Sequence, residues 1–365
     1  MSTSGTGAVL ITYDISGPDP LGTADAIRAE QTIEFPYELA TTWIQEQVVG
    51  HIVEAHESVV TIAYNPDVIG GDIVQFLNLL WGNVSLFKGV RVIDISLPDS
   101  VLAAFPGPRF GVDGLRTIFD EPTRPLLCTA LKPMGRSADD LAADARILTE
   151  SGFDIIKDDH GLANQPWAPW LERVSKVSAA VRQVIEATGQ RAVYMPALNV
   201  PSDRMHAAAY AAKEAGAGAL LVLPGLTGFD AIRVLATDDE LALPIMSHPS
   251  FLGSHVVNND QGVSHGLLIG MINRLAGADL CIFPHYGGRF SFSPQECRDI
   301  QDRCSQDLGR VRASWPTPGG GMSLERVDEI IAFYGNDVTL LIGGALHRGD
   351  LATNARGIAR AVRDR

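Results

Sequence analysis

Four polar residues, Lys157, Asp158, Asp159 and His160, follow directly on an apolar run in the segment SGFDIIKDDHG. Apolar runs of this kind form buried parallel strands, so this strand would bring an amine and two carboxylates to one point. In one interpretation, the two aspartates simply neutralise Lys157. In the other, burial lowers the pKa of the amine, and the neutral amine adds CO2 to become a carbamate. The carbamate and Asp159 would then offer hard oxygen ligands to Mg2+, and His160 would add a ring nitrogen, a less usual magnesium ligand.

Other polar residues and glycines also follow short apolar runs, where further strands are expected to end. They are Lys132, Asn199, His248 and His285, with the glycine runs 319–321 and 343–344. In a barrel of parallel strands the active site lies at the C-terminal ends of the strands. A single lysine or histidine there is usually structural, but convergence of several favours catalysis.

The glycine runs indicate an anion site. Backbone N–H groups of paired glycines, beside a helix N-terminus such as the one expected at Ser323, bind phosphate. We therefore expect a substrate phosphate on four glycines, and the alternative is two tight turns. These glycines are Gly320, Gly321, Gly343 and Gly344.

One unit repeats along the chain from about residue 125 onward. A short apolar run is followed by polar or glycine residues, a helical stretch, and a glycine where the helix would end. Eight such units over about 240 residues predict a (β/α)8 TIM barrel, an α/β fold, for residues 116–365. A doubly wound open sheet is the structural alternative.

Residues 1–115 show a different pattern. The segments AVLITYDI, RAEQTIEF, HIVEAHESVVTIAYN and VRVIDISLP are predicted as strands, and GGDIVQFLNLLWGN is predicted as a helix. This favours a separate N-terminal α+β domain of ferredoxin-like architecture. The proline- and glycine-rich segment 102–116 would connect it to the barrel.

Composition narrows the class of protein. The chain has 365 residues, 46% of them hydrophobic, and a formal net charge of −14. The acidic balance argues against nucleic-acid partners and against binding to anionic membranes. Four cysteines without a C-x-x-C pair indicate reduced thiols in a cytoplasmic protein. No apolar run is long enough for a signal peptide or a membrane span.

Three segments resemble the RuBisCO large-chain family. RPLLCTALKPMGRS resembles its first-strand motif, GFDIIKDDHGLANQPWAPWLERV its second-strand motif, and LLWGNVSLFKGVRV a segment of its N-terminal domain. The resemblance implies that Lys132 transfers protons, that Lys157 is carbamylated by CO2, and that Asp159 binds Mg2+. It also implies that His248 is the histidine after strand five, and that the four glycines bind phosphate.

In the same family, an asparagine of the N-terminal domain reaches the active site of the neighbouring subunit. The resemblance assigns this role to Asn83 and so implies an obligate homodimer with shared active sites. The alternative is that Asn83 caps its own helix or forms a turn before Val84.

Departures from the family pattern point to a RuBisCO-like protein of the non-carboxylating form IV type. His160 stands where the family has a ligand glutamate, and LKPMGRS lacks the family's second lysine. Pro249 replaces a phosphate-binding arginine. FPHYGGRF replaces the mobile lysine loop and leaves Arg289 as its only cation, so we expect a single substrate phosphate.

The chemistry implied is enolisation of a phosphorylated ketone, in which a proton or carboxylate leaves next to a carbonyl. We expect a decarboxylase or transcarboxylase of the 3-oxo-isoapionate 4-phosphate type. Loss of carboxylate from a β-keto acid needs a group that accepts the electrons of the broken bond, and it depends less on a loop that closes over a newly formed carboxylate. One alternative is an isomerase or enolase of methylthio-pentulose phosphates. Another is a non-enzymatic sugar-phosphate-binding protein, which only the His160 change supports.

Overall fold

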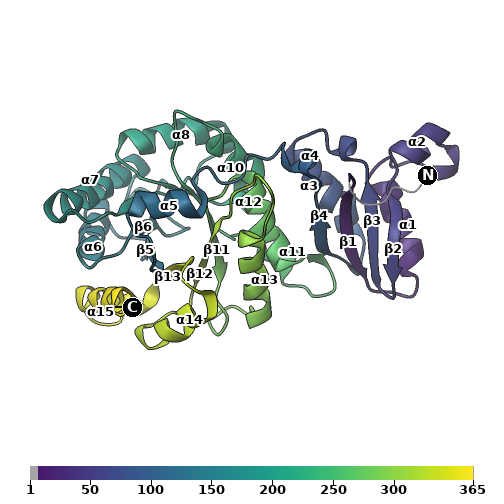
Figure 1. The fold of residues 1–365 in the computed structure, drawn as a ribbon. Helices are drawn as coiled ribbons and strands as arrows, with labels where there is room; N and C mark the ends of the chain where they lie inside the picture. Colours follow the sequence, from purple (N-terminus) through teal and green to yellow (C-terminus); the bar gives the residue numbers. More distant parts are fainter. Residues whose placement is uncertain (1–6, 365) are drawn as a thin grey trace.

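The computed structural model describes residues 7–364, which form two sheets at opposite ends of an elongated molecule (Figure 1). In the N-terminal sheet, β1 (Val9–Ile15) pairs antiparallel with β3 (Val59–Tyr64) and β4 (Val90–Ser96). β2 (His51–His56) forms one edge against β3, and β10 (Gly262–Val263) pairs parallel with β4 at the other. Because β10 comes from the C-terminal half of the chain, it joins the two parts.

Helices cover this sheet, so the predicted α+β architecture is confirmed. They are α1 (Pro20–Glu30), η1 (Tyr37–Leu39), α2 (Thr42–Gln47), η2 (Pro66–Ile69), α3 (Ile73–Trp81), η3 (Asn83–Leu86) and α4 (Asp99–Leu102). The strand predicted at RAEQTIEF is wrong, because its first residues end α1. Asp19 caps this helix by accepting a hydrogen bond from the Gly22 N–H at 2.9 Å, and Pro20 fixes its first turn.

The second sheet is the predicted barrel of eight parallel strands, in the order β7-β6-β5-β13-β12-β11-β9-β8. A parallel bridge between Ala197 and Leu221 brings the two ends of this order together. The strands are β5 (Leu126–Leu131), β6 (Ile155–Asp158), β7 (Val193–Met195), β8 (Leu220–Val222), β9 (Ile245–Ser247), β11 (Leu280–Pro284), β12 (Trp315–Gly319) and β13 (Thr339–Ile342).

Helices surround the barrel (Figure 1). They are α5 (Gly111–Phe119), α6 (Ala138–Glu150), α7 (Trp170–Thr188), α8 (Ser202–Glu214), α9 (Pro224–Thr227), α10 (Phe229–Ala236), α11 (Gly253–Val256), η4 (Gly266–Ile272), α12 (Asn273–Ala276), α13 (Pro294–Ser305), η5 (Leu324–Arg326), α14 (Val327–Tyr334), η6 (Gly344–His347) and α15 (Leu351–Arg363). The predicted domain boundary at residues 115/116 falls inside α5 and stays a prediction. In residues 7–364 no helix is long and apolar enough to cross a membrane.

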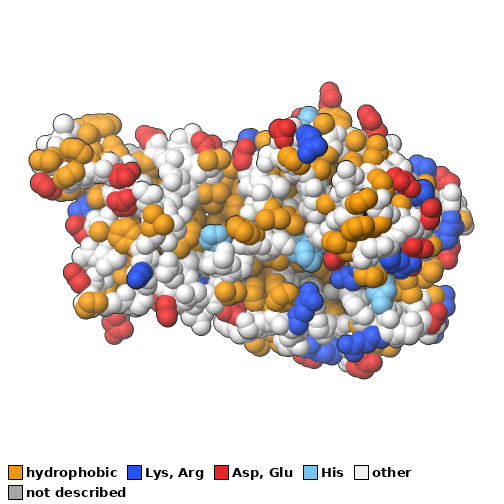
Figure 2. Space-filling model, turned by 180° about the vertical axis from the view of Figure 1, so that it is seen from behind, with side chains coloured by type: hydrophobic (Ala, Val, Ile, Leu, Met, Phe, Trp, Pro, Cys, Tyr) orange, Lys and Arg blue, Asp and Glu red, His pale blue; other side chains and the backbone are white. Residues whose placement is uncertain are grey.

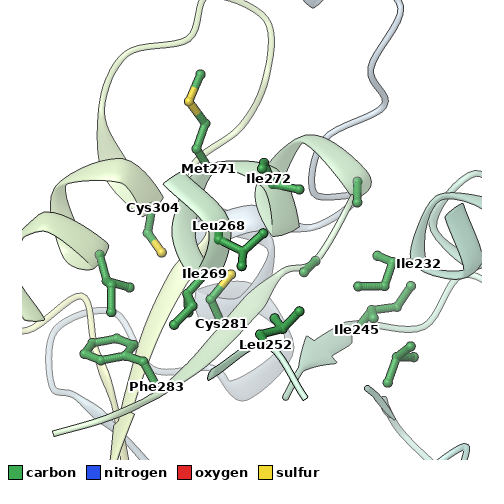
Figure 3. Packing of buried hydrophobic residues seen from close by; sticks show 14 of the residues in the cluster. Ile232, Ile245, Leu252, Leu268, Ile269, Met271, Ile272, Cys281, Phe283 and Cys304 are labelled. Carbon is green, nitrogen blue, oxygen red and sulfur yellow. The ribbon is translucent and has the colours of Figure 1, made fainter. Parts of the chain in front are cut away.

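Two hydrophobic cores hold the barrel together. One fills its interior and includes Cys128, Ile155 and Trp315. The other is continuous with the core of the N-terminal domain and lies between the barrel strands and the outer helices, where η4, β11 and α13 pack together (Figure 3). Ile155 belongs to the inner core and Ile156 to the outer one. Because strand side chains alternate between faces, β6 sends Lys157 inward and Asp158 outward.

Candidate active site

Lys157 lies at the top of the inner core with only 2% of its surface exposed. Its Nζ donates a hydrogen bond to the backbone carbonyl of Asp158 at 3.0 Å. Burial lowers the pKa of the Lys157 amine, although Asp159 and other nearby groups partly oppose the shift. Burial therefore makes the neutral amine, which is the form that adds CO2, more accessible than in an exposed lysine.

Asp158 belongs to the packing between the barrel and α7. Its Oδ2 accepts from Arg173 Nη2 at 3.1 Å and Nε at 3.2 Å, and its Oδ1 accepts from the Tyr194 hydroxyl at 2.7 Å. The side chains of Asp158 and Arg173 are both fully buried. The interpretation in which both aspartates neutralise Lys157 is therefore wrong for Asp158, whose carboxylate is paired on the other face of the strand.

Asp159 lies at the barrel mouth beside two other candidate residues. Its Oδ1 is 3.2 Å from Lys132 Nζ and 3.6 Å from His160 Nδ1. Burial alone would raise the pKa of Asp159, but its contact with His160 and the nearby Lys132 and Lys157 outweigh this effect. The pKa lies well below its ordinary value, so Asp159 is a carboxylate at neutral pH.

The rings of His160 and His248 stack with centroids 4.7 Å apart and an angle of 14° between their planes. His248 Nδ1 accepts a hydrogen bond from the Ser250 N–H at 3.2 Å. Burial, and then the charges of Lys157 and His160, lower the pKa of His248 well below its ordinary value. His248 is therefore neutral at pH 7 and carries its proton on Nε2.

The remaining strand-end residues frame this group. Asn199 Nδ2 donates to the carbonyls of His160 at 2.6 Å and Leu162 at 3.1 Å, so it fixes the loop after β6. A Cβ built on Gly343 would stand 3.7 Å from Lys132 Nζ. Lys132 therefore lies between Asp159 and the glycine loop after β13.

The glycine loop after β12 has an unusual backbone. Gly320 and Gly321 have φ angles of +87° and +68°, which favour glycine. A helical segment begins at Ser323 as expected, because Ser323 is the N-cap of the short helix η5, and α14 follows η5 directly at Val327. The phosphate role of the four glycines stays a prediction.

Asn83 is exposed on the N-terminal domain, where it begins η3 directly after α3. Its Nδ2 donates to Glu30 Oε1 at 2.8 Å, whereas Gly82 caps α3. Glu30 was predicted in a strand but ends α1, so its contact with Asn83 could not be expected from the sequence. The role of Asn83 in a partner's site stays a prediction.

The donors available to a metal are few in the unmodified chain. Residues 7–364 contain no group of three His, Cys, Asp or Glu side chains arranged to hold a metal ion. Asp159 and His160 are neighbours, and a carbamate on Lys157 would supply the missing oxygen ligands. The residues therefore fit a divalent cation only if Lys157 is carbamylated.

Comparisons with known proteins identify the family. Residues 111–288 match the model for the ribulose bisphosphate carboxylase large chain, catalytic domain. The chain is 35% identical over 347 residues to ribulose bisphosphate carboxylase-like protein 1 of Rhodopseudomonas palustris, covering 93% of this chain and 92% of that protein. It is 37% identical over 330 residues to 5-methylthioribulose-1-phosphate isomerase of Rhodospirillum rubrum, covering 88% and 86%.

A solved structure agrees over nearly the whole length. The RuBisCO-like protein from Rhodopseudomonas palustris superposes with a TM-score of 0.89 at 34% identity, covering 98% of both chains. The TIM barrel and the N-terminal α+β domain are thus parts of a known architecture. The chain belongs to the RuBisCO large-chain family, among its RuBisCO-like proteins.

Proposed function

We propose that the chain is an enzyme that transfers a proton next to the carbonyl group of a phosphorylated keto-sugar, through an enediolate. The observation that carries the proposal is the position of Lys132, whose amine lies 3.2 Å from Asp159 and beside Gly343. An amine placed between a carboxylate and a phosphate-binding loop would meet the carbon atoms next to the bound phosphate.

Each residue at the mouth has a role in this proposal. Lys132 removes and returns the proton, and neutral His248 offers its Nε2–H to a substrate oxygen. Lys157 as a carbamate, Asp159 and His160 would hold Mg2+. When bound, that cation would supply positive charge to stabilise an enediolate. Gly320, Gly321, Gly343 and Gly344 would hold the phosphate through their N–H groups.

Isomerisation or enolisation of a methylthio-pentulose phosphate is the better supported reaction. The relative from Rhodospirillum rubrum is named for an isomerase of such a substrate. Exposed apolar side chains also lie in four loops that follow barrel strands, where a methylthio group would find apolar contacts. They are Met134, Trp167, Phe251 and Phe290.

A decarboxylase of the 3-oxo-isoapionate 4-phosphate type is the second candidate. Arg289 favours it, because this exposed cation follows β11, where it could bind a substrate carboxylate. Its guanidinium lies 4.9 Å from the centre of the Phe290 ring.

Turnover of both compounds separates the candidates. Purified protein with Mg2+ and bicarbonate would receive 5-methylthioribulose 1-phosphate or 3-oxo-isoapionate 4-phosphate, and NMR would follow the products. Formation of an isomer with no release of CO2 supports the isomerase, and release of CO2 from the substrate supports the decarboxylase. Binding of either compound without turnover would instead favour the non-enzymatic binding protein.

A homodimer with shared active sites is part of the proposal. Asn83 and Glu30 lie together on the N-terminal domain, and apolar side chains gather at the same end of the molecule (Figure 2). Phe35, Leu39 and Trp43 are 51%, 66% and 66% exposed in the single chain. A second copy would cover these side chains and bring Asn83 to its barrel mouth.

A further inference from the structure

Arg326, the last residue of η5, lies between the loops that follow β11 and β12. Its Nη1 donates to the Gly321 carbonyl at 2.9 Å, and its Nη2 is 3.4 Å from His285 Nε2. A Cβ on Gly287 would stand 3.5 Å from the guanidinium. A single side chain thus contacts both loops.

The contact with the Gly321 carbonyl fixes the orientation of a peptide group. In a trans peptide the carbonyl and the following N–H point in opposite directions, so drawing the Gly321 carbonyl toward Arg326 turns the Met322 N–H away from it. Gly320 and Gly321 are both left-handed, with φ of +87° and +68°. A backbone of this kind has other conformations available, and the arginine selects one of them.

Glu329 holds the arginine in place from α14. Its Oε2 accepts from Arg326 Nε at 3.1 Å, and its Oε1 accepts from Nη2 at 3.0 Å. The Tyr286 hydroxyl donates to the same Oε1 at 3.1 Å. Because the carboxylate neutralises the guanidinium and occupies two of its donor groups, Arg326 is suited to ordering the loops rather than to binding phosphate itself.

His285 completes the arrangement from the end of β11. It is 1% exposed, and its Nδ1 is 2.9 Å from the Tyr334 hydroxyl. Burial, and then the charge of Arg326, lower the pKa of His285 to about 4. The ring is therefore neutral at pH 7 and accepts from Arg326 through Nε2. A histidine with both nitrogens engaged and almost no exposed surface is suited to supporting the loop.

We infer that Arg326 is a positioning residue, which holds the Gly320–Gly321 backbone in the conformation that binds the substrate phosphate. The inference rests on the proposed phosphate role of these glycines. It assigns a function to a residue that lies outside the barrel strands, and it gives a reason for the contact between the guanidinium and the Gly321 carbonyl.

Phosphate binding by four variants tests the inference. Calorimetry with inorganic phosphate would compare wild type with Arg326→Gln, Arg326→Lys, Glu329→Gln and the control Arg298→Gln. Arg298 is a partly buried arginine nearby, which lies 4.0 Å from the centre of the Phe333 ring and donates to Gln301. We expect Arg326→Gln to weaken binding about tenfold or more, since small displacements of a binding group are costly. The control should bind like wild type.

Arg326→Lys separates positioning from charge. Lysine keeps the positive charge but cannot contact Gly321, Glu329 and His285 together, so phosphate binding should still weaken several-fold. In turnover assays the KM for the phosphorylated substrate should rise much more than kcat falls. The pKa of His285, followed by NMR, should rise in Arg326→Gln, because the neighbouring positive charge is gone.

The outcomes distinguish this inference from the proposed function. If wild type binds no phosphate, the proposed phosphate site is wrong and the inference falls with it. If wild type binds phosphate and both Arg326 variants bind equally well, only the inference is wrong. If phosphate binding is lost in Arg326→Gln but fully kept in Arg326→Lys, the effect depends on the positive charge alone. That result would also overturn the inference. If Arg326→Gln fails to fold, Glu329→Gln decides, since it keeps the arginine and should weaken binding several-fold.

Discussion

Replacing Arg173 with methionine leaves a buried carboxylate without its cation. Arg173 makes two of the hydrogen bonds to Asp158, and neither side chain is exposed. Within residues 7–364, the Tyr194 hydroxyl and the Ala197 N–H, at 2.7 and 3.1 Å, would be the remaining donors to that carboxylate. The perturbation acts directly behind the strand that carries Lys157.

The expected cost is about 3–5 kcal/mol in the free energy of unfolding, as for other buried ion pairs that lose one partner. This is a large part of the stability of an ordinary protein, which is about 5–15 kcal/mol. The double variant Asp158→Asn/Arg173→Met removes both charges and keeps acceptor and donor atoms near Tyr194 and Ala197. It should be more stable than Arg173→Met alone.

The pH dependence gives a second signature. Burial raises the pKa of Asp158, and Arg173 opposes the shift in the wild type. Without Arg173 the folded-state pKa lies further above the unfolded value, so the variant loses stability as pH rises through the folded pKa. The difference in the free energy of unfolding between wild type and Arg173→Met should therefore be smaller at pH 5 than at pH 8.

Urea unfolding followed by circular dichroism would measure these effects at both pH values. A loss below about 1 kcal/mol in Arg173→Met would refute the reasoning, because the penalty for an unpaired buried carboxylate would be missing. A double variant no more stable than the single one would refute it as well.

Three further predictions concern the site and the assembly. In bicarbonate and Mg2+, Lys157 should gain the mass of a carbamate, and a bare amine under those conditions would remove the proposed metal site. The protein should not fix labelled bicarbonate on ribulose bisphosphate, since Pro249 replaces a phosphate ligand and Arg289 is the only cation of the loop after β11; labelled phosphoglycerate above background would contradict this. Asn83→Ala and Lys132→Ala chains, each inactive alone, should recover up to about a quarter of wild-type activity as hybrid dimers. Hybrids that form without activity would disprove shared sites.

The barrel was predictable because its signals are local. Apolar runs, helix caps and glycines at helix ends repeat along the chain, and Ser137, for example, caps α6. Convergence of Lys132, Asp159 and His248 also followed from the fold alone, since strand ends meet at one face. The start of α1 carries local signals of the same kind, Asp19 and Pro20, which the strand predicted at RAEQTIEF did not take into account.

Contacts between distant segments were not predictable. Asn83 and Glu30 are 53 residues apart, and Arg326 and His285 are 41 apart, so no local pattern connects them. The separation of Asp158 from Lys157 depends on the alternation of one short strand and on an arginine of the next helix. Such pairings become visible only when the packing of helices against the barrel is known.

The most direct test of the proposed proton transfer is deuterium exchange at the substrate. Wild-type protein with 5-methylthioribulose 1-phosphate in D2O should incorporate deuterium at the carbon next to the carbonyl group, measured by NMR, and Lys132→Met should incorporate none above the uncatalysed rate. The variant should still bind the substrate, because the phosphate loops are unchanged. Product formed by the wild type without deuterium, or equal incorporation by the variant, would contradict the role of Lys132.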